Sequence, residues 1–247
     1  MMTMFIAQCQ AELRRLFRNK FYVIWSLCVP IFFYFLYTKI ISIPMKNEEA
    51  WHIHYLMSMT VFSVMGSSIM SIGMRLVQER AFGWTHYLRV TPLPSSLYFL
   101  AKMVSQTLIH VVSIIIIFLV GYVMNDIQLT WSSWIGAACW ILVMSLPFLA
   151  LGLMIGTMKS VDTAAGIANV LYLGLAITGG LWMPVDVFPS LVQKMVHYLP
   201  SYQYGSGAWA ITTGHYPSLS MMASLIGYFL LFMVVSLYIH KKQEGVA

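Results

Sequence analysis

Long apolar stretches alternate with short polar ones along most of the chain. Six stretches are long enough for a helix to cross a hydrocarbon core of ~30 Å, which takes about 20 residues. They cover residues 21–43, 55–74, 103–124, 131–158, 163–183 and 219–239. The fourth is longer than a crossing requires, so we expect it to be tilted or kinked at Pro147. The pattern predicts an all-α, polytopic membrane protein with six transmembrane helices, forming a single domain over residues 1–247.

Composition supports this class and excludes others. Of the 247 residues, 60% are hydrophobic and 9% are charged, whereas charged residues make up about 25% of an ordinary soluble domain. So few charges exclude a soluble enzyme, a disordered chain and a secreted disulfide scaffold. Three widely spaced cysteines predict neither a disulfide framework nor a zinc site. The net charge of +6 is distributed beside apolar stretches, which argues against a nucleic-acid partner.

Lys and Arg are divided unevenly between the loops on the two sides of the predicted membrane. One side carries 11 of the 14, within residues 14–20 and 75–102 and at 159 and 241–242, and the other has Lys39, Lys46 and Lys194. Basic residues accumulate on the cytoplasmic side. We therefore expect both termini to be cytoplasmic, in a cell membrane.

The predicted membrane interior contains no carboxylate. All eight acidic residues fall in the loops or termini of this topology, so a proton or sodium relay of intramembrane acids is not expected. The chain contains no phosphate-binding loop and no long soluble stretch. If it moves a solute uphill, a separate ATPase subunit supplies the energy. We expect no catalytic residue, no metal and no cofactor bound by this chain.

Two cytoplasmic segments have the character of contact surfaces. Residues 1–20 predict an amphipathic interface helix, with Arg14, Arg15 and Arg18 facing lipid phosphates or a partner; a simple basic anchor is the alternative. In the loop over residues 75–96, aromatic and charged residues alternate at helical spacing up to a Thr-Pro-x-Pro stop. Aromatic and Arg side chains are typical of docking surfaces, although an ordinary interfacial loop is the alternative.

The outer segment over residues 184–218 is rich in apolar residues and contains four prolines. Non-helical backbone at membrane depth persists only where protein covers it. We therefore expect short helices that re-enter the outer leaflet as a lid over an exit. A surface loop with no gating role is the alternative.

Two features inside the spans concern helix packing. His110, in the third span, is expected to hydrogen-bond a neighbouring helix. The Gly152-x-x-x-Gly156 motif permits close helix approach, either within one subunit or between two.

Three motifs resemble one transporter family. The first is Glu79-Arg80-x-x-Gly83-x(4)-Leu88-x-x-Thr91-Pro92-Leu93, the second is Phe17-x-Asn19-Lys20 followed by Pro30-Ile-Phe-Phe, and the third is Gly179-Gly180-Leu-Trp-Met-Pro184 followed by Phe188-Pro189 and Leu199-Pro200-Ser-Tyr202. In this order they resemble the permease subunits of the second ABC exporter family, which exports drugs, lipids and polysaccharides.

The resemblance implies partners and an activity. The loop after the second span would be the coupling element that docks on an ABC ATPase, present in two copies, which binds ATP and magnesium. A second permease subunit, identical or related, would face this one, with substrate passing between the second and fifth spans. The expected function is export of a drug, antimicrobial or lipid-like compound from a bacterial cell. An intramembrane enzyme or an accessory membrane protein without transport is the alternative.

The resemblance and the residue pattern together select three groups of candidate residues. The ATPase-coupling residues are Gln78, Glu79, Arg80, Phe82, Gly83, Trp84 and Tyr87. The substrate-pathway residues are Thr60, Ser63, Met65, Asn169, Tyr172 and Leu175. The outer-gate residues are Gly180, Trp182 and Pro184.

Overall fold

A computed structural model describes residues 2–41, 47–84, 90–91 and 93–244, and every element in these ranges is a helix. The elements are α1 (Met2–Arg18), α2 (Lys20–Phe35), the π-helix η1 (Leu36–Ile40), α3 (Glu48–Ala81), α5 (Ser95–Asn125), α6 (Trp131–Val143), α7 (Leu146–Ile155), α8 (Val161–Thr178), the 3₁₀ helix η2 (Val185–Val187), α9 (Ser190–Val196), α10 (Pro200–Thr212) and α11 (Leu219–Glu244). The predicted all-α class is confirmed.

Five helical segments in the described ranges are long and apolar enough to cross a membrane: α3, α5, α6 with α7, α8 and α11. The first expected span corresponds to a shorter apolar segment, Ile24–Ile40, made by α2 and η1. Six crossings therefore stay a prediction.

The long fourth stretch breaks between Val143 and Leu146. Pro147 lies in the first turn of α7, where its missing N–H costs no helical hydrogen bond. The expected kink is confirmed.

Local sequence explains where several helices begin. Asn47 caps α3 by accepting a 3.1 Å hydrogen bond from the Ala50 N–H, and Glu48 and Glu49 follow in the first turn, where carboxylates favour the helix dipole. Thr130 caps α6 and Ser160 caps α8 in the same way. These caps stand at the polar stretches that separate the apolar ones.

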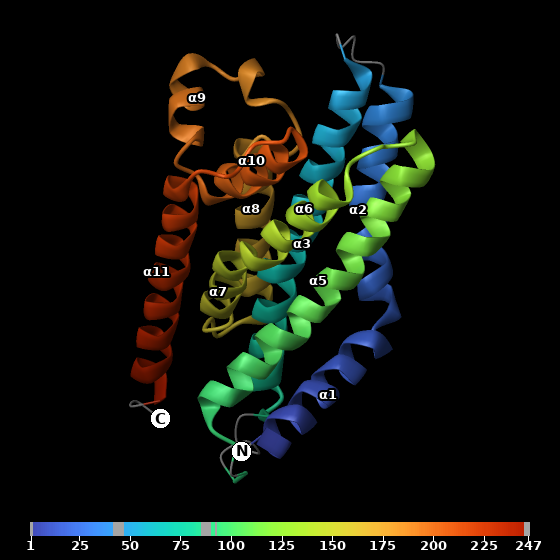
Figure 1. The fold of residues 1–247 in the computed structure, drawn as a ribbon. Coiled ribbons are helices and arrows are strands. Elements are labelled where there is room, and N and C mark those ends of the chain that lie inside the picture. The colour runs from blue at the N-terminus through green and yellow to red at the C-terminus, as the bar shows by residue number, and fades with distance from the viewer. Residues whose placement is uncertain (1, 42–46, 85–89, 92, 245–247) are drawn as a thin grey trace.

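Helix α3 lies at the centre of the bundle (Figure 1), and its middle is almost completely buried. It contacts α2, α5, α7, α8 and α10. The start of α1, the end of α3, the start of α5 and the end of α11 all lie toward one end of the molecule, at the bottom of Figure 1. We call this the lower end, and the opposite end, with α9, the upper end.

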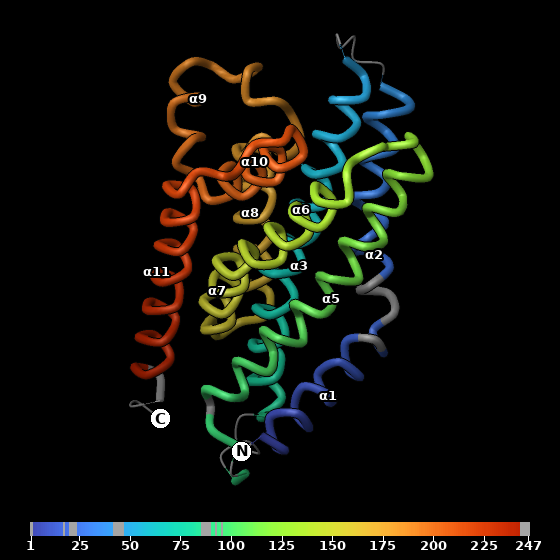
Figure 2. Tube along the Cα trace, viewed as in Figure 1, coloured from blue at the N-terminus to red at the C-terminus, as the bar shows by residue number. Residues whose placement is uncertain are grey.

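The segment over residues 184–218 folds into η2, α9 and α10 at the upper end (Figure 2). Helix α10 packs against α6, α3 and α11. The Trp140 indole donates to the Tyr204 carbonyl at 2.8 Å, and the Tyr204 hydroxyl donates to the Ile141 carbonyl at 2.6 Å. Short helices were expected here and are present, while their role as a lid and their depth in a bilayer stay predictions.

Candidate functional site

A cluster of charged side chains is buried where α1, α3 and α5 meet near the lower end. Lys102 on α5 is fully buried, and Glu12 on α1 and Glu79 on α3 are 4% and 3% exposed. The Lys102 Nζ donates to Glu12 Oε1 and to Glu79 Oε1, both at 2.7 Å. One ammonium thus joins carboxylates from two other helices. Buried ions of opposite sign must be paired in this way, because an unpaired one is very costly.

Three further side chains complete this ionic cluster. Arg15 on α1 pairs with Glu79, and the Tyr98 hydroxyl donates to the same carboxylate. Arg75 pairs with Glu12 at 3.2 Å and donates to Gln106 Oε1 at 2.9 Å. The cluster therefore contains three cations and two carboxylates, which leaves one positive charge in excess.

A polar ladder continues from the cluster toward the middle of the bundle, between α3 and α5. The Ser71 hydroxyl donates to Gln106 at 3.0 Å, the Gln106 amide lies 3.3 Å from the His110 ring, and His110 lies 3.4 Å from the Ser68 hydroxyl. The expected bond from His110 to a neighbouring helix is confirmed. Lys102, Gln106 and His110 are four apart and so share one face of α5.

The cluster corrects one expectation about the acidic residues. Glu79 was expected on a short cytoplasmic docking helix separate from the second span, but α3 continues through Ala81 and the Glu79 carboxylate is buried. Its coupling role stays a prediction. Its partners Lys102 and Tyr98, and the second carboxylate Glu12, were not predicted from the sequence. The available signal was the four-residue spacing of Lys102, Gln106 and His110 within an otherwise apolar segment.

The other predicted coupling residues have different positions. Phe82 and Trp84 are 82% and 46% exposed beyond the end of α3. Gly83 between them has φ +72°, the left-handed region that glycine favours. Gln78 is partly buried, and Tyr87 lies outside the described residues.

Arg80 holds the end of α7. Its guanidinium donates to the carbonyls of Gly156 at 2.9 Å and Thr157 at 3.0 Å. A cation at a helix C-terminus satisfies carbonyls that have no partner within the helix. Arg80 therefore fixes the loop between α7 and α8 to the lower end of α3.

The two glycines of the Gly152-x-x-x-Gly156 motif serve packing within the subunit. A Cβ on Gly152 would lie 2.5 Å from the Ser68 carbonyl oxygen, and one on Gly156 would lie 2.6 Å from Leu76. Both contacts are made to α3 of the same chain, which accounts for the motif without a second subunit.

The predicted pathway residues divide between interior and surface. Thr60 and Met65 are fully buried in α3, and the Thr60 hydroxyl bonds within its own helix. Ser63 and Tyr172 line one groove. Asn169 is exposed on α8, and Leu175 is partly buried. Of the six predicted pathway residues, Ser63 and Tyr172 lie together in the lining of this groove.

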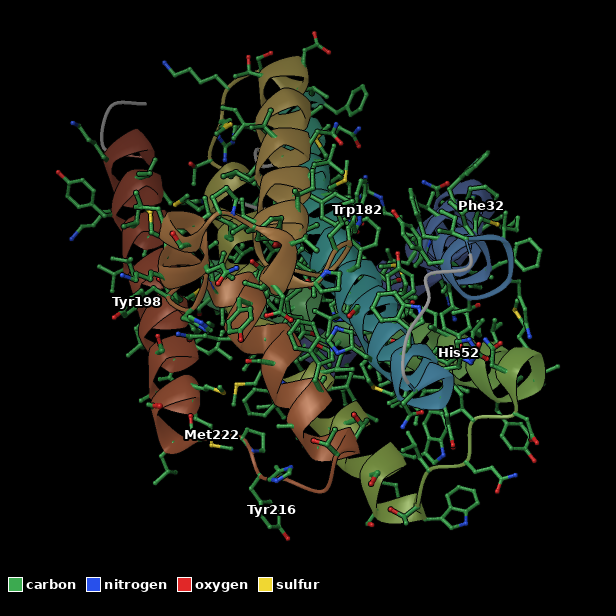
Figure 3. All side chains as sticks on the ribbon, turned by 90° about the horizontal axis from the view of Figure 1, so that it is seen from above. Phe32, His52, Trp182, Tyr198, Tyr216 and Met222 are labelled. Carbon is green, nitrogen blue, oxygen red and sulfur yellow. The ribbon has the colours of Figure 1, made fainter. Side chains whose placement is uncertain are left out.

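The outer-gate residues lie at the upper end of α8. Gly180 adopts φ +74° and begins the turn after the helix. The Trp182 ring stacks on Phe33 of α2, with centroids 5.0 Å apart, and meets Phe62 of α3 edge-on at 5.6 Å. Seen from above, Trp182 lies beside α3 (Figure 3). Pro184 follows at the start of η2 and is partly buried.

Comparison with known proteins agrees with this architecture. Residues 3–213 match the family described as ABC-2 type transporter. The chain belongs to this family. It is also 52% identical, over 97% of its length and 98% of the relative's, to a Bacillus subtilis (strain 168) protein named "Putative transport permease YvfS". The chain is therefore the multi-pass membrane permease of an ABC-2 type transporter, and the motifs that indicated this family are confirmed.

For an ABC-2 permease, the position of the ionic cluster is informative. The family's permeases generally work with ABC ATPase subunits, and the cluster lies directly behind the exposed end of α3. It joins that end to α1 and α5 through side chains that are almost fully buried. The cluster therefore ties the lower ends of α1, α3 and α5 together.

Proposed function

We propose that this permease exports a lipophilic or amphipathic compound, powered by a separate ABC ATPase that docks beside the end of α3. The ionic cluster is the observation that carries the proposal. A force applied at Phe82 and Trp84 acts on α3, and through Glu79 and Lys102 on α1 and α5. ATP and magnesium bind to the partner ATPase, present in two copies.

A hollow of about 350 Å³ lies between α1 and the end of α3 and supports docking there. Gln8 and Ala11 form one wall, Phe82 and Trp84 form the other, and Arg15 and the two buried carboxylates form the floor. Exposed aromatic residues around a small pocket are typical anchors of protein interfaces.

A second permease subunit would complete the pathway. Helix α8 is apolar, but only 17% of its membrane-length window is buried within the subunit. Its exposed face includes Asn169, whose amide is poorly suited to lipid because hydrocarbon offers it no hydrogen bond. Covering this face with a second permease would satisfy the amide and place α8 along the substrate pathway.

Replacing Phe82 with Ser tests the docking surface. Because Phe82 is 82% exposed, we expect the variant to fold normally and to lose about fivefold to thirtyfold in affinity for the ATPase, as for an interface anchor worth ~1–2 kcal/mol. Co-purification in detergent from cells that express both subunits measures this.

Tyr216 provides the matched control, since it is 96% exposed at the upper end and points away from the bundle (Figure 3). Tyr216→Ser should retain the ATPase. Undiminished co-purification with Phe82→Ser would place the docking surface elsewhere.

The proposed topology places both termini in the cytoplasm of a bacterial cell. In a background without Cys9, Cys28 and Cys139, an impermeant maleimide added outside intact cells should label cysteines placed at exposed Asp126 and Asp186. It should not label a cysteine at exposed Ser160, which would react only after the cells are opened. The opposite pattern would invert the topology and remove the ATPase from the lower end.

A further inference from the structure

A groove of about 960 Å³ runs between α2 and α3, from the end of α1 to Tyr172 on α8. Trp25, 64% exposed, and Val29, 38% exposed, form one wall, so the groove is open along the side of the bundle. The residues at its two ends along α3, Ser63 and Gln78, are fifteen positions apart. At ~1.5 Å per residue this is about 22 Å, which exceeds half of a ~30 Å hydrocarbon core. The groove is therefore long enough for an extended alkyl chain from one leaflet.

The charged groups of the groove all lie at its lower end and all have the same sign. Arg15, Arg18 and Arg75 line it, and none of its described lining residues is acidic. The carboxylates closest behind this wall, Glu12 and Glu79, are already paired with Lys102 and with two of these arginines. The ionic cluster retains one excess positive charge, and Arg18, which is exposed, adds a second.

The rest of the groove is apolar, with a few hydroxyl groups. Val29 and Pro30 on α2 face Met70 and Met74 on α3. Flexible methionine side chains adapt to ligands of varied shape. At the far end the Tyr172 ring covers Gly66, where a Cβ would lie 2.5 Å from the ring, and the ring stacks on Phe62 at 4.6 Å. The groove is thus cationic at one end and closed by an aromatic ring at the other.

We infer that this groove is the loading site for an anionic amphiphile, whose head lies at Arg15 and Arg18 and whose tail lies against Val29, Pro30 and Met70. This inference rests on the proposed export function and narrows its substrate class. Arginine is suited to phosphate, sulfate and carboxylate heads because its planar guanidinium donates in parallel to two oxygens. A cationic head would meet like charges there, with no acidic residue of the lining to offset them.

Binding to the purified permease in a neutral detergent tests the headgroup. The probes are an alkyl sulfate, an alkyl maltoside and an alkyl trimethylammonium that share one fluorescent tail. We expect the sulfate to bind at least about tenfold more tightly than the ammonium, with the maltoside between them. Equal affinity for the three probes would overturn the inference.

Two pairs of variants locate the site. Arg18→Gln should weaken sulfate binding about threefold to tenfold, whereas Arg14→Gln, at an exposed arginine of the same helix outside the groove, should not. Val29→Trp should block the tail, and Ile24→Trp, at a 54% exposed position outside the groove, should not. Equal effects within both pairs would mean that the arginines attract anions without a defined groove.

Transport distinguishes cargo from a resident membrane lipid. In vesicles that contain the permease with its ATPase, ATP should move the sulfate probe from the ATP-side leaflet to the opposite one, and Val29→Trp should stop this movement. Binding without ATP-dependent movement would mean a resident lipid and would overturn the loading role. If no ATPase associates, the proposed export function fails, while the binding measurements still decide the headgroup chemistry independently.

Discussion

Lys102→Met should sharply lower the stability of the folded permease and abolish its coupling to the ATPase. The substitution keeps an apolar stem of similar length but removes the ammonium that lies 2.7 Å from both Glu12 and Glu79. Each nearly buried carboxylate then loses one of its two cations, while Glu79 keeps Arg15 and Glu12 keeps Arg75. Removing the sole partner of a buried ion costs about 3–5 kcal/mol, which is the upper limit for this variant. Thermal unfolding in detergent can be monitored through the loss of the monodisperse species. The midpoint of this transition should be much lower than for the wild type.

Two further variants make this prediction specific to the cluster. Lys159→Met removes an exposed lysine and should leave the midpoint unchanged. Combining Lys102→Met with Glu79→Gln removes a buried carboxylate whose remaining cation, Arg15, is half-exposed, and it should recover part of the loss. A wild-type midpoint for Lys102→Met would show that the ionic cluster does not hold α1, α3 and α5 together.

Gly152→Ala should produce the second large effect, by separating α3 from α7. The added Cβ would lie 2.5 Å from the Ser68 carbonyl oxygen, which belongs to the backbone and cannot rotate away. Overpacking of this kind costs about 1–3 kcal/mol. The unfolding midpoint should fall even though alanine favours helices more than glycine does.

Gly227 on α11 is the matched control, because a Cβ built there would meet open space beyond the backbone of its own helix. Gly227→Ala should leave the midpoint unchanged or raise it, through the helical preference of alanine alone. If both variants behave alike, the close approach of α3 and α7 does not limit stability.

Much of the fold could be predicted from hydropathy, because the length of an apolar stretch is a local property. The segments later occupied by α3, α5, α6 with α7, α8 and α11 were identified from it, as was the break near Pro147. Their lengths were less predictable: α3 extends from Glu48 to Ala81, well beyond the apolar core expected for it. Polar ends such as Arg75 and Glu79 stay helical because other helices cover and pair them.

The candidate site was predictable only in part. The loop over residues 75–96 predicted that Phe82 and Trp84 are presented at the surface, because aromatic residues among charged ones are unusual in a segment that contacts water alone. Both are exposed in the structure. The buried position of Glu79 did not follow, because its partners Lys102 and Arg15 lie 23 and 64 positions away. The face that a helix turns toward its neighbour depends on the rotation of the helix about its axis and on the angle at which the two helices cross. The spacing of residues within one segment determines neither.

The sequence by itself determined the all-helical membrane class, the positions of most apolar segments and, through three loose motifs in order, the ABC-2 family. Those properties depend on composition and on residues close together in the chain. Only the tertiary structure decided that Glu12, Glu79 and Lys102 form one buried cluster, that Gly152 packs within the subunit, and that arginines and apolar residues of three helices line one groove. Each of these arises where helices distant in sequence approach within contact distance, since buried charges and close backbone contacts are stabilised only by the partners that packing supplies.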